Sequence, residues 1–386
     1  MSNKMEYESD GEEHEEIEDL SDPFVVTCYQ SAGQIAQKAL KEVIALCVDG
    51  KSIVEICTFG DALIETECSK TFTKHKGLIK GIGFPTCISV NSCIGHFSPL
   101  KGDTRTLKNG DVVKIDLGAH INGYVAVAAH TVIVGQTGTA PTQGKVADAV
   151  CAAHYAMESA LRLIRPGNKT SQVTEAITKC AEFYQVTPAQ GILSHELKRF
   201  SMDGEKVIFS KVEAGQKTQV FEFLENEVYC VDIVMSTGDG KSKEQEDRTT
   251  VYKRVVDNQY QLKIKSSKDF LTEVDKRFTA FPFTIRSFAD VTKAKLGLSE
   301  CIQHNLITQF PVFYDRPGSI VVQFKTTVLC LPSGNQKVVG QDLQLPFVKS
   351  EFSITDPKII EFLNTPLRAP KKTTATKTAT AKMDTN

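Results

Sequence analysis

The stretch that decides the fold is residues 112–134, VVKIDLGAHINGYVAVAAHTVIV, in which two apolar runs flank Asn122-Gly123. An Asn-Gly pair between apolar runs is a strong signal of a tight β-hairpin. We therefore predict two antiparallel strands, over 111–118 and 124–134. Asp116 lies inside the first run, where an unpaired charge would be costly to bury.

Helical patterns flank this hairpin on both sides. Asp22 and Pro23 suit the start of a helix that ends before Gly50. Further helices are predicted over about 52–68, 145–164 and 171–184, with helical patterns again in 267–278 and 293–307. Further strands are predicted over 84–91, 227–234 and 320–331. Because strands and helices alternate without a strict βαβ repeat, we expect an α+β fold.

Composition excludes several classes of protein. The chain has 386 residues, and 45 Lys+Arg against 47 Asp+Glu give a net charge of −2, which excludes a polycation that coats nucleic acid. No apolar run approaches the ~20 residues of a membrane span, and the start lacks the apolar region of a secretory signal. Eleven dispersed cysteines without a CxxC pair indicate reduced thiols rather than structural zinc. We expect a soluble, intracellular monomer.

Three segments differ in character. Residues 1–22 hold ten Asp or Glu and one Lys, and are expected to be a disordered acidic leader. Residues 369–386 are a Lys/Thr/Ala tail, also expected to be disordered. The folded body is expected over 23–368.

Three ionisable residues interrupt apolar strands: Asp116, Asp232 in VYCVDIV and Lys325 in VVQFKTTVLCL. Each alone is more often a polar-face residue or a structural hydrogen-bonding group than a functional one. His96 and His195 are weaker signals still. Together, these five residues indicate a functional site.

Five segments, in order, resemble type II methionine aminopeptidase: FPTCISVNSCIGHFSP, VVKIDLGAHINGY, LSHELK, ENEVYCVDIVMSTGDG and VVQFKTTVLCLP. The resemblance spans about residues 24–347. It implies the pita-bread fold, a pseudo-twofold α+β sandwich around a curved antiparallel sheet. The gap between Asp232 and Lys325 leaves room for the helical insertion of the type II branch, expected over about 245–315.

The resemblance also identifies the positions that hold two metal ions in the peptidase. The two Asp ligands match Asp116 and Val127, the His ligand matches His195, and the two Glu ligands match Asp232 and Lys325. The substrate-side His matches His96, and a second active-site His falls near Asp203.

Two of these matches remove metal ligands. Val127 has no donor atom, and Lys325 brings an ammonium to the place of a cation. We therefore expect no metal, no cofactor and no peptidase activity. We also expect Lys325 to pair with Asp116, Asp232 or both.

Loss of these ligands resembles the proliferation-associated protein family, inactive relatives that include a growth regulator binding a receptor tyrosine kinase. RTTVYKR at 248–254 and CIQHNLITQFPVFYD at 301–315 also fit. The resemblance implies binding to ribosomal RNA and the large ribosomal subunit, with roles in ribosome biogenesis, translation and growth control. It further implies cytoplasm, nucleus and nucleolus as locations, and DNA and signalling or transcription proteins as further partners.

A basic segment supports an RNA contact. Residues 241–295 hold 13 Lys or Arg against 8 Asp or Glu, with Tyr252 and Tyr260 interleaved. From charge alone, a solvated face of the insertion explains this segment equally well. The candidate RNA-binding residues are Lys241, Lys243, Arg248, Lys253, Arg254, Lys263, Lys265 and Lys268.

Two other functions stay open at this stage. The old substrate cleft could capture peptides without hydrolysis, in an adaptor or a transcriptional co-regulator. A metalloaminopeptidase with altered ligands is disfavoured by Val127 and Lys325.

Overall fold

The computed structural model describes residues 18–136, 140–213, 215–343 and 347–368. Its helices are α1 (Pro23–Leu46), α2 (Ile53–Lys70), α3 (Lys145–Leu163), α4 (Thr170–Phe183), α5 (Lys265–Arg277), α6 (Val291–Gln303) and α7 (Pro357–Asn364), with a 3-10 turn η1 (Ile285–Ser287). None of the helices in these ranges combines the length and apolar character that crossing a bilayer requires.

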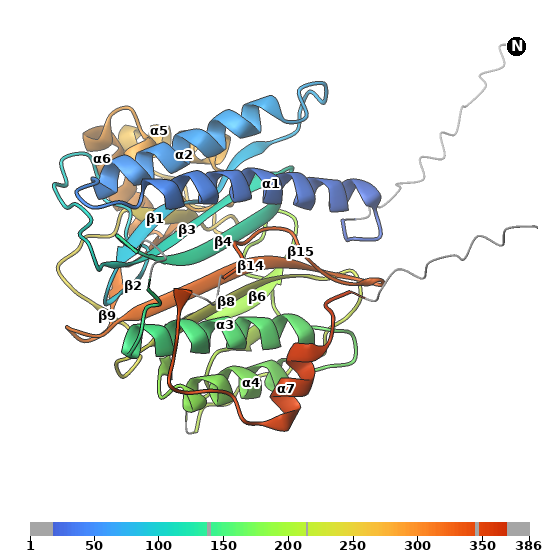
Figure 1. Ribbon diagram of the computed structural model, residues 1–386. Helices are drawn as coiled ribbons and strands as arrows, with labels where there is room; N and C mark the ends of the chain where they lie inside the picture. Colours follow the sequence, from blue (N-terminus) through green and yellow to red (C-terminus); the bar gives the residue numbers. More distant parts are fainter. Residues whose placement is uncertain (1–17, 137–139, 214, 344–346, 369–386) are drawn as a thin grey trace, which may run out of the picture.

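One antiparallel sheet runs through the middle of the molecule (Figure 1). In spatial order its strands are β1 (Lys80–Val90), β3 (Val112–Ile121), β4 (Tyr124–Ile133), β14 (Val321–Leu331), β8 (Val228–Ser236), β6 (Leu193–Leu197) and β7 (Val207–Phe209). Two further strands pair with it: β15 (Gly334–Lys337) beside β14, and β5 (Thr187–Pro188) beside β8.

Helices cover the sheet in two pairs. The pair α1 and α2 packs on β1, β3 and β4, whereas α3 and α4 pack on β14, β8 and β7. The two halves meet where β4 lies beside β14. This arrangement confirms the predicted α+β pita-bread fold.

Local sequence signals determine several boundaries. The Asp22 carboxylate accepts a hydrogen bond from the Phe24 N–H at 2.8 Å and caps α1, with Pro23 as its first residue. Asn122 and Gly123 have φ values of 52° and 86°, the left-handed backbone that a tight hairpin requires. The predicted hairpin is therefore confirmed.

The segment expected as a helical insertion contains α5 and α6 but also four short strands. Three of them form a small sheet of their own: β10 (Val251–Arg254), β11 (Phe283–Thr284) and β12 (Ile307–Phe310). Phe270, Phe283 and Phe288 belong to a separate hydrophobic core within it. A second small sheet joins β9 (Lys243–Glu244), β13 (Phe313–Tyr314) and β2 (Cys93–Gly95).

A buried ion pair fastens this insertion to the body. Arg286 Nη2 lies 2.6 Å from Asp61 Oδ2, and Arg286 Nη1 donates to the Pro99 carbonyl at 2.7 Å. The other oxygen of Asp61 accepts from the Thr86 N–H of β1 at 2.7 Å. One guanidinium therefore links η1 to α2 and to the loop after β2.

The folded body begins before the expected boundary at Pro23. Leu20 is buried, and Glu18 pairs with Arg199 at 2.8 Å. Residues 18–22 therefore pack on the body. The prediction that they are part of a disordered leader is wrong. Residues 1–17 and the tail at 369–386 lie outside the described residues.

Candidate functional site

Neighbouring strands place one row of side chains across the sheet. Asp116 of β3 pairs with Ala129 of β4, which pairs with Lys325 of β14, which pairs with Asp232 of β8. Directly opposed residues of an antiparallel sheet point to the same face. Tyr124 of β4 packs on α1 and, an odd number of residues from Ala129, points to the other face. The row therefore lies on the face opposite to α1.

Lys325 joins the two carboxylates of this row. Its Nζ lies 2.6 Å from Asp116 Oδ2 and 3.0 Å from Asp232 Oδ2. The Lys325 side chain is 11% exposed, and each carboxylate side chain is 8% exposed. Because Ala129 carries only a methyl group, the lysine can reach across β4 to Asp116. The structure places Lys325 against both expected partners.

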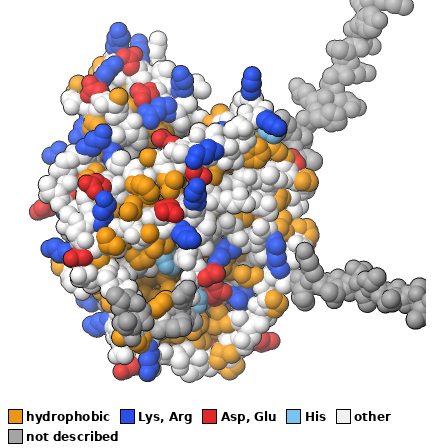
Figure 2. Space-filling model, turned by 45° about the horizontal axis from the view of Figure 1, so that its top comes forward, with side chains coloured by type: hydrophobic (Ala, Val, Ile, Leu, Met, Phe, Trp, Pro, Cys, Tyr) orange, Lys and Arg blue, Asp and Glu red, His pale blue; other side chains and the backbone are white. Residues whose placement is uncertain are grey.

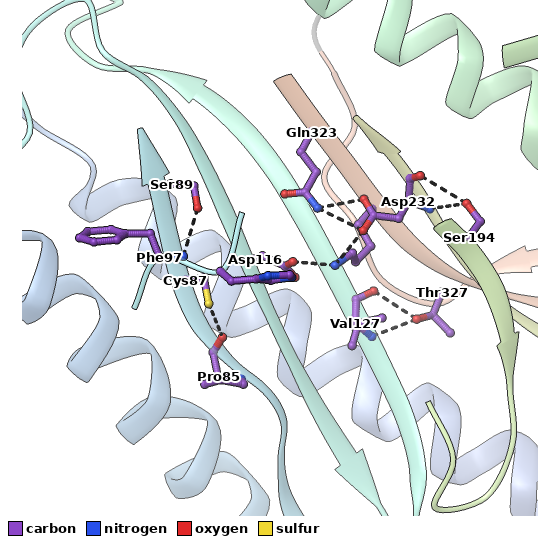
Figure 3. A network of polar contacts seen from close by, with 12 residues as sticks. Pro85, Cys87, Ser89, Phe97, Asp116, Val127, Ser194, Asp232, Gln323 and Thr327 are labelled. Carbon is purple, nitrogen blue, oxygen red and sulfur yellow. Dashed lines mark hydrogen bonds and ion pairs between the residues drawn. The ribbon is translucent and has the colours of Figure 1, made fainter. Parts of the chain in front are cut away.

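Two residues that the sequence analysis missed complete the network. Gln323 Nε2 donates to both oxygens of Asp232, at 2.9 and 3.2 Å, and Ser194 Oγ accepts from the Asp232 N–H at 2.8 Å (Figure 3). The second oxygen of Asp116 has no hydrogen-bond partner among the described residues. Gln323 precedes Lys325 by two residues, and residues two apart on a strand point to the same face. The sequence could therefore have identified Gln323 as a neighbour of Lys325.

One aromatic ring lies over the ammonium, and two further rings pack beside it. Lys325 Nζ lies 5.3 Å from the centroid of the Phe84 ring, within cation–π range. The His96 ring lies 6.1 Å from the ring of Phe84 and 5.3 Å from that of Phe310. Its Nδ1 donates to the Pro311 carbonyl at 2.9 Å, which fixes His96 as a structural neighbour of the cluster.

Burial and neighbouring charges set the protonation of the cluster. Burial raises the pKa of Asp116 to about 6, opposed by Lys325 and assisted by Asp232. Burial acts to lower the pKa of Lys325, but the two carboxylates outweigh it and hold this pKa above its ordinary value. Burial lowers the pKa of His96 and of His195 to about 4, so both rings are neutral at pH 7.

Of the two remaining positions of the expected metal set, His195 keeps an imidazole, whereas Val127 has no donor atom. Val127 is buried, and its backbone N–H and carbonyl are both bonded to Thr327 Oγ1, at 2.9 and 3.1 Å. His195 Nδ1 contacts the Glu196 carbonyl at 3.3 Å. Asp203, the loose match to the second histidine, is exposed and pairs with Lys253.

These residues do not fit two metal ions. A dinuclear centre needs carboxylates and neutral imidazoles around one shared space. Here the Lys325 ammonium fills the space between Asp116 and Asp232. Across the described part of the chain, no group of three His, Cys, Asp or Glu side chains could hold a metal ion.

The candidate RNA-binding residues do not form one stripe. Lys253 pairs with Asp203, and Arg254 pairs with Asp275 at 3.0 Å, so both are engaged within the fold. The other six are exposed and form no ion pair with another described residue: Lys241, Lys243, Arg248, Lys263, Lys265 and Lys268. Tyr252 is buried, whereas Tyr260 is 40% exposed and stacks on His304 at 3.6 Å.

The six exposed residues fall into two groups. The β9 group consists of Lys241, Lys243 and Arg248, in and beside strand β9. The α5 group consists of Lys263, Lys265 and Lys268, at the start of helix α5. Figure 1 shows α5 at the upper left of the molecule and β9 lower on the same side, beside β2. The two groups therefore belong to different parts of the fold.

Comparison with known proteins gives the chain's relatives. The family model "Metallopeptidase family M24" matches residues 27–196. Proliferation-associated protein A of Dictyostelium discoideum is 57% identical and covers 98% of each chain. The curved DNA-binding protein of Schizosaccharomyces pombe is 37% identical and covers 91% of this chain and 93% of its own. The solved structure of a thermophilic Arx1 is 30% identical, with a TM-score of 0.84, and covers 90% of this chain and all of that one.

Proposed function

We propose that this chain, which belongs to the proliferation-associated proteins of the M24 metallopeptidase fold, is a non-catalytic protein that binds ribosomal RNA on the large ribosomal subunit. In this proposal it acts in ribosome biogenesis, translation and growth control, in the cytoplasm and in the nucleus including the nucleolus. DNA and signalling or transcription proteins are further partners in the same proposal.

One observation carries the non-catalytic part of the proposal. The Lys325 ammonium lies between the two carboxylates that would have to bind metal, at 2.6 and 3.0 Å. The Lys325 ammonium would repel a metal dication between these carboxylates. Position 325 also no longer supplies the bridging carboxylate that two metal ions require.

Metal binding tests this part directly. We expect the purified protein to bind no Co²⁺ or Mn²⁺ by calorimetry and to release no methionine from Met-peptides. A variant with Val127→Asp, Asp232→Glu and Lys325→Glu restores the peptidase's ligand set and should gain metal binding. Stoichiometric metal or Met-peptide cleavage by the unmodified protein would contradict the proposal.

The RNA-binding part rests on the exposed basic groups. The α5 group presents three lysines that form no ion pair with another described residue, near the exposed Tyr260 in sequence. Lysine side chains neutralise phosphates, and an exposed aromatic ring can stack on an unpaired base. A relative at 37% identity is named a curved DNA-binding protein, which is consistent with affinity for nucleic acid.

Co-sedimentation with large ribosomal subunits tests this part. We expect saturable binding that weakens as salt rises. Changing Lys263, Lys265 and Lys268 to Glu should reduce binding strongly, because it reverses three charges on one exposed surface. The matched control changes three exposed lysines of the body, Lys74, Lys76 and Lys108, and should bind normally. Absence of binding at low salt would overturn the ribosome proposal.

A further inference from the structure

The helix-covered face of the sheet contains a cavity of about 590 Å³. It lies between α1, β4 and α3, beside residues 341–343, and so on the face opposite to the Lys325 cluster. Figure 2 shows this face hollowed, with hydrophobic and histidine side chains around the hollow. A volume in the range of about 300–1,000 Å³ is typical of small-molecule sites.

The walls of this cavity are largely apolar. Its lining includes Ile44 of α1, Val132 of β4, Val150 of α3 and Leu343. Val48, also in the lining, is 52% exposed. An apolar ligand body would remove these side chains from water, which is the main source of affinity in such pockets.

One buried polar side chain in the lining lacks a partner. His130 is 7% exposed, and its Nδ1 is buried without a hydrogen-bond partner among the described residues. Burial lowers the pKa of this ring to about 4, so the ring is neutral. A buried N–H without a hydrogen-bond partner is rarer than a buried acceptor without one. We therefore place the proton of the neutral ring on Nε2 and leave Nδ1 as the unpaired acceptor. Nε2–H is then a donor with no described protein acceptor.

The charges around the cavity favour an anion. Lys41 of α1 lines it, is exposed and forms no ion pair with another described residue. Asp342 also lines it and pairs with Lys337 at 2.5 Å. The charges of Lys41, Lys337 and Asp342 therefore sum to +1 beside the cavity.

We propose that this cavity binds a small carboxylic acid with an apolar body. The carboxylate is received by the Lys41 ammonium and the His130 imidazole, and the body packs among Ile44, Val150 and Leu343. The proposal does not depend on RNA binding or on the state of the metal positions, because the cavity lies on the other face of the sheet.

Calorimetric titration of the full chain with octanoate tests the proposal, with octanamide as the neutral probe of equal length. We expect one site per chain for octanoate and at least about tenfold weaker binding of octanamide. Lys41→Glu should weaken octanoate binding about tenfold, because it reverses the charge that receives the carboxylate. Val150→Phe should weaken it similarly by filling the cavity.

The matched control is Lys295→Glu, the same change at an exposed position within helix α6. It should leave octanoate binding unchanged. Absence of saturable octanoate binding would overturn the proposal, as would equal binding of octanamide or full binding by Lys41→Glu. Lys41 is exposed on a helix, so this variant still decides the question if Val150→Phe fails to fold.

Discussion

At the scale of single residues, one lysine compensates the charge of two buried carboxylates. Asp116 and Asp232 would repel one another if both were ionised and buried, and Lys325 supplies the compensating charge. The cluster of two carboxylates and one ammonium has a net charge of −1 when both carboxylates are ionised. This excess negative charge and the burial together explain why the pKa of Asp116 stays raised despite its ion pair.

Removing the lysine tests its structural role. Lys325→Met should lower the free energy of unfolding by about 3–5 kcal/mol, because it leaves two buried carboxylates without a counter-charge. Denaturant unfolding at pH 7 measures this loss. Lys241→Met, at an exposed position, is the matched control and should change stability by less than about 0.5 kcal/mol. A loss below about 1 kcal/mol for Lys325→Met would contradict the role assigned to the cluster.

The raised pKa of Asp116 gives a pH dependence with a defined sign. Its pKa rises from 3.8 in the unfolded chain to about 6 in the folded protein, so the folded state binds this proton more tightly. The contribution of Asp116 to the free energy of unfolding is therefore present at low pH. It is lost as pH rises from 3.8 to about 6.

Comparison with Asp116→Asn isolates this effect from other groups. Relative to that variant, the unmodified protein should become less stable as pH rises through this window. Unfolding measured at a series of pH values checks the difference. The opposite slope would mean that Lys325 controls the ionisation of Asp116 more strongly than burial does.

At the scale of secondary-structure elements, the sequence predicted most of what positions the site. Two apolar runs and the Asn-Gly pair between them located β3 and β4, and the capping residues located the start of α1. The strands β9 to β13 were missed, since strands of two to four residues carry too few positions for a period to be recognised. The row across the sheet also could not be predicted, because it depends on the register of strands far apart in sequence.

The candidate site was also predicted only in part from the sequence. The resemblance identified Asp116, Asp232 and Lys325, and the structure joins them. The stripe of eight basic residues was an interpretation of net charge, and charge does not specify which side chains face solvent. Lys253 and Arg254 are paired within the fold for this reason.

The buried pair between Asp61 and Arg286 should hold the insertion on the body. Arg286→Met leaves the Asp61 carboxylate buried without its counter-charge, and we expect a loss of about 3–5 kcal/mol in unfolding free energy. Hydrogen exchange should rise most in β10, α5 and α6, because the bond between η1 and α2 is lost. Arg248→Met, at an exposed position, is the control. Unchanged exchange in the insertion would show that its own core and backbone contacts suffice.

At the scale of the whole molecule, the two exposed basic groups differ in the number of acidic residues beside them. The β9 group is interrupted by Glu244, Glu246 and Asp247, whereas the α5 group is followed by one acidic residue in its first helical turns, Asp269. Neighbouring carboxylates repel phosphates and reduce the net attraction. The α5 group should therefore dominate binding to RNA.

Salt dependence distinguishes the contributions of the two groups. Each phosphate contact adds about 0.7–0.9 to the slope of log affinity against log salt concentration. Changing the α5 group to Glu should reduce this slope by about 2 to 3, because three contacts are lost. Changing the β9 group, Lys241, Lys243 and Arg248, should reduce it by less than about 1. Equal reductions would mean that RNA contacts both groups, and a larger reduction for the β9 group would move the main RNA contact from α5 to β9.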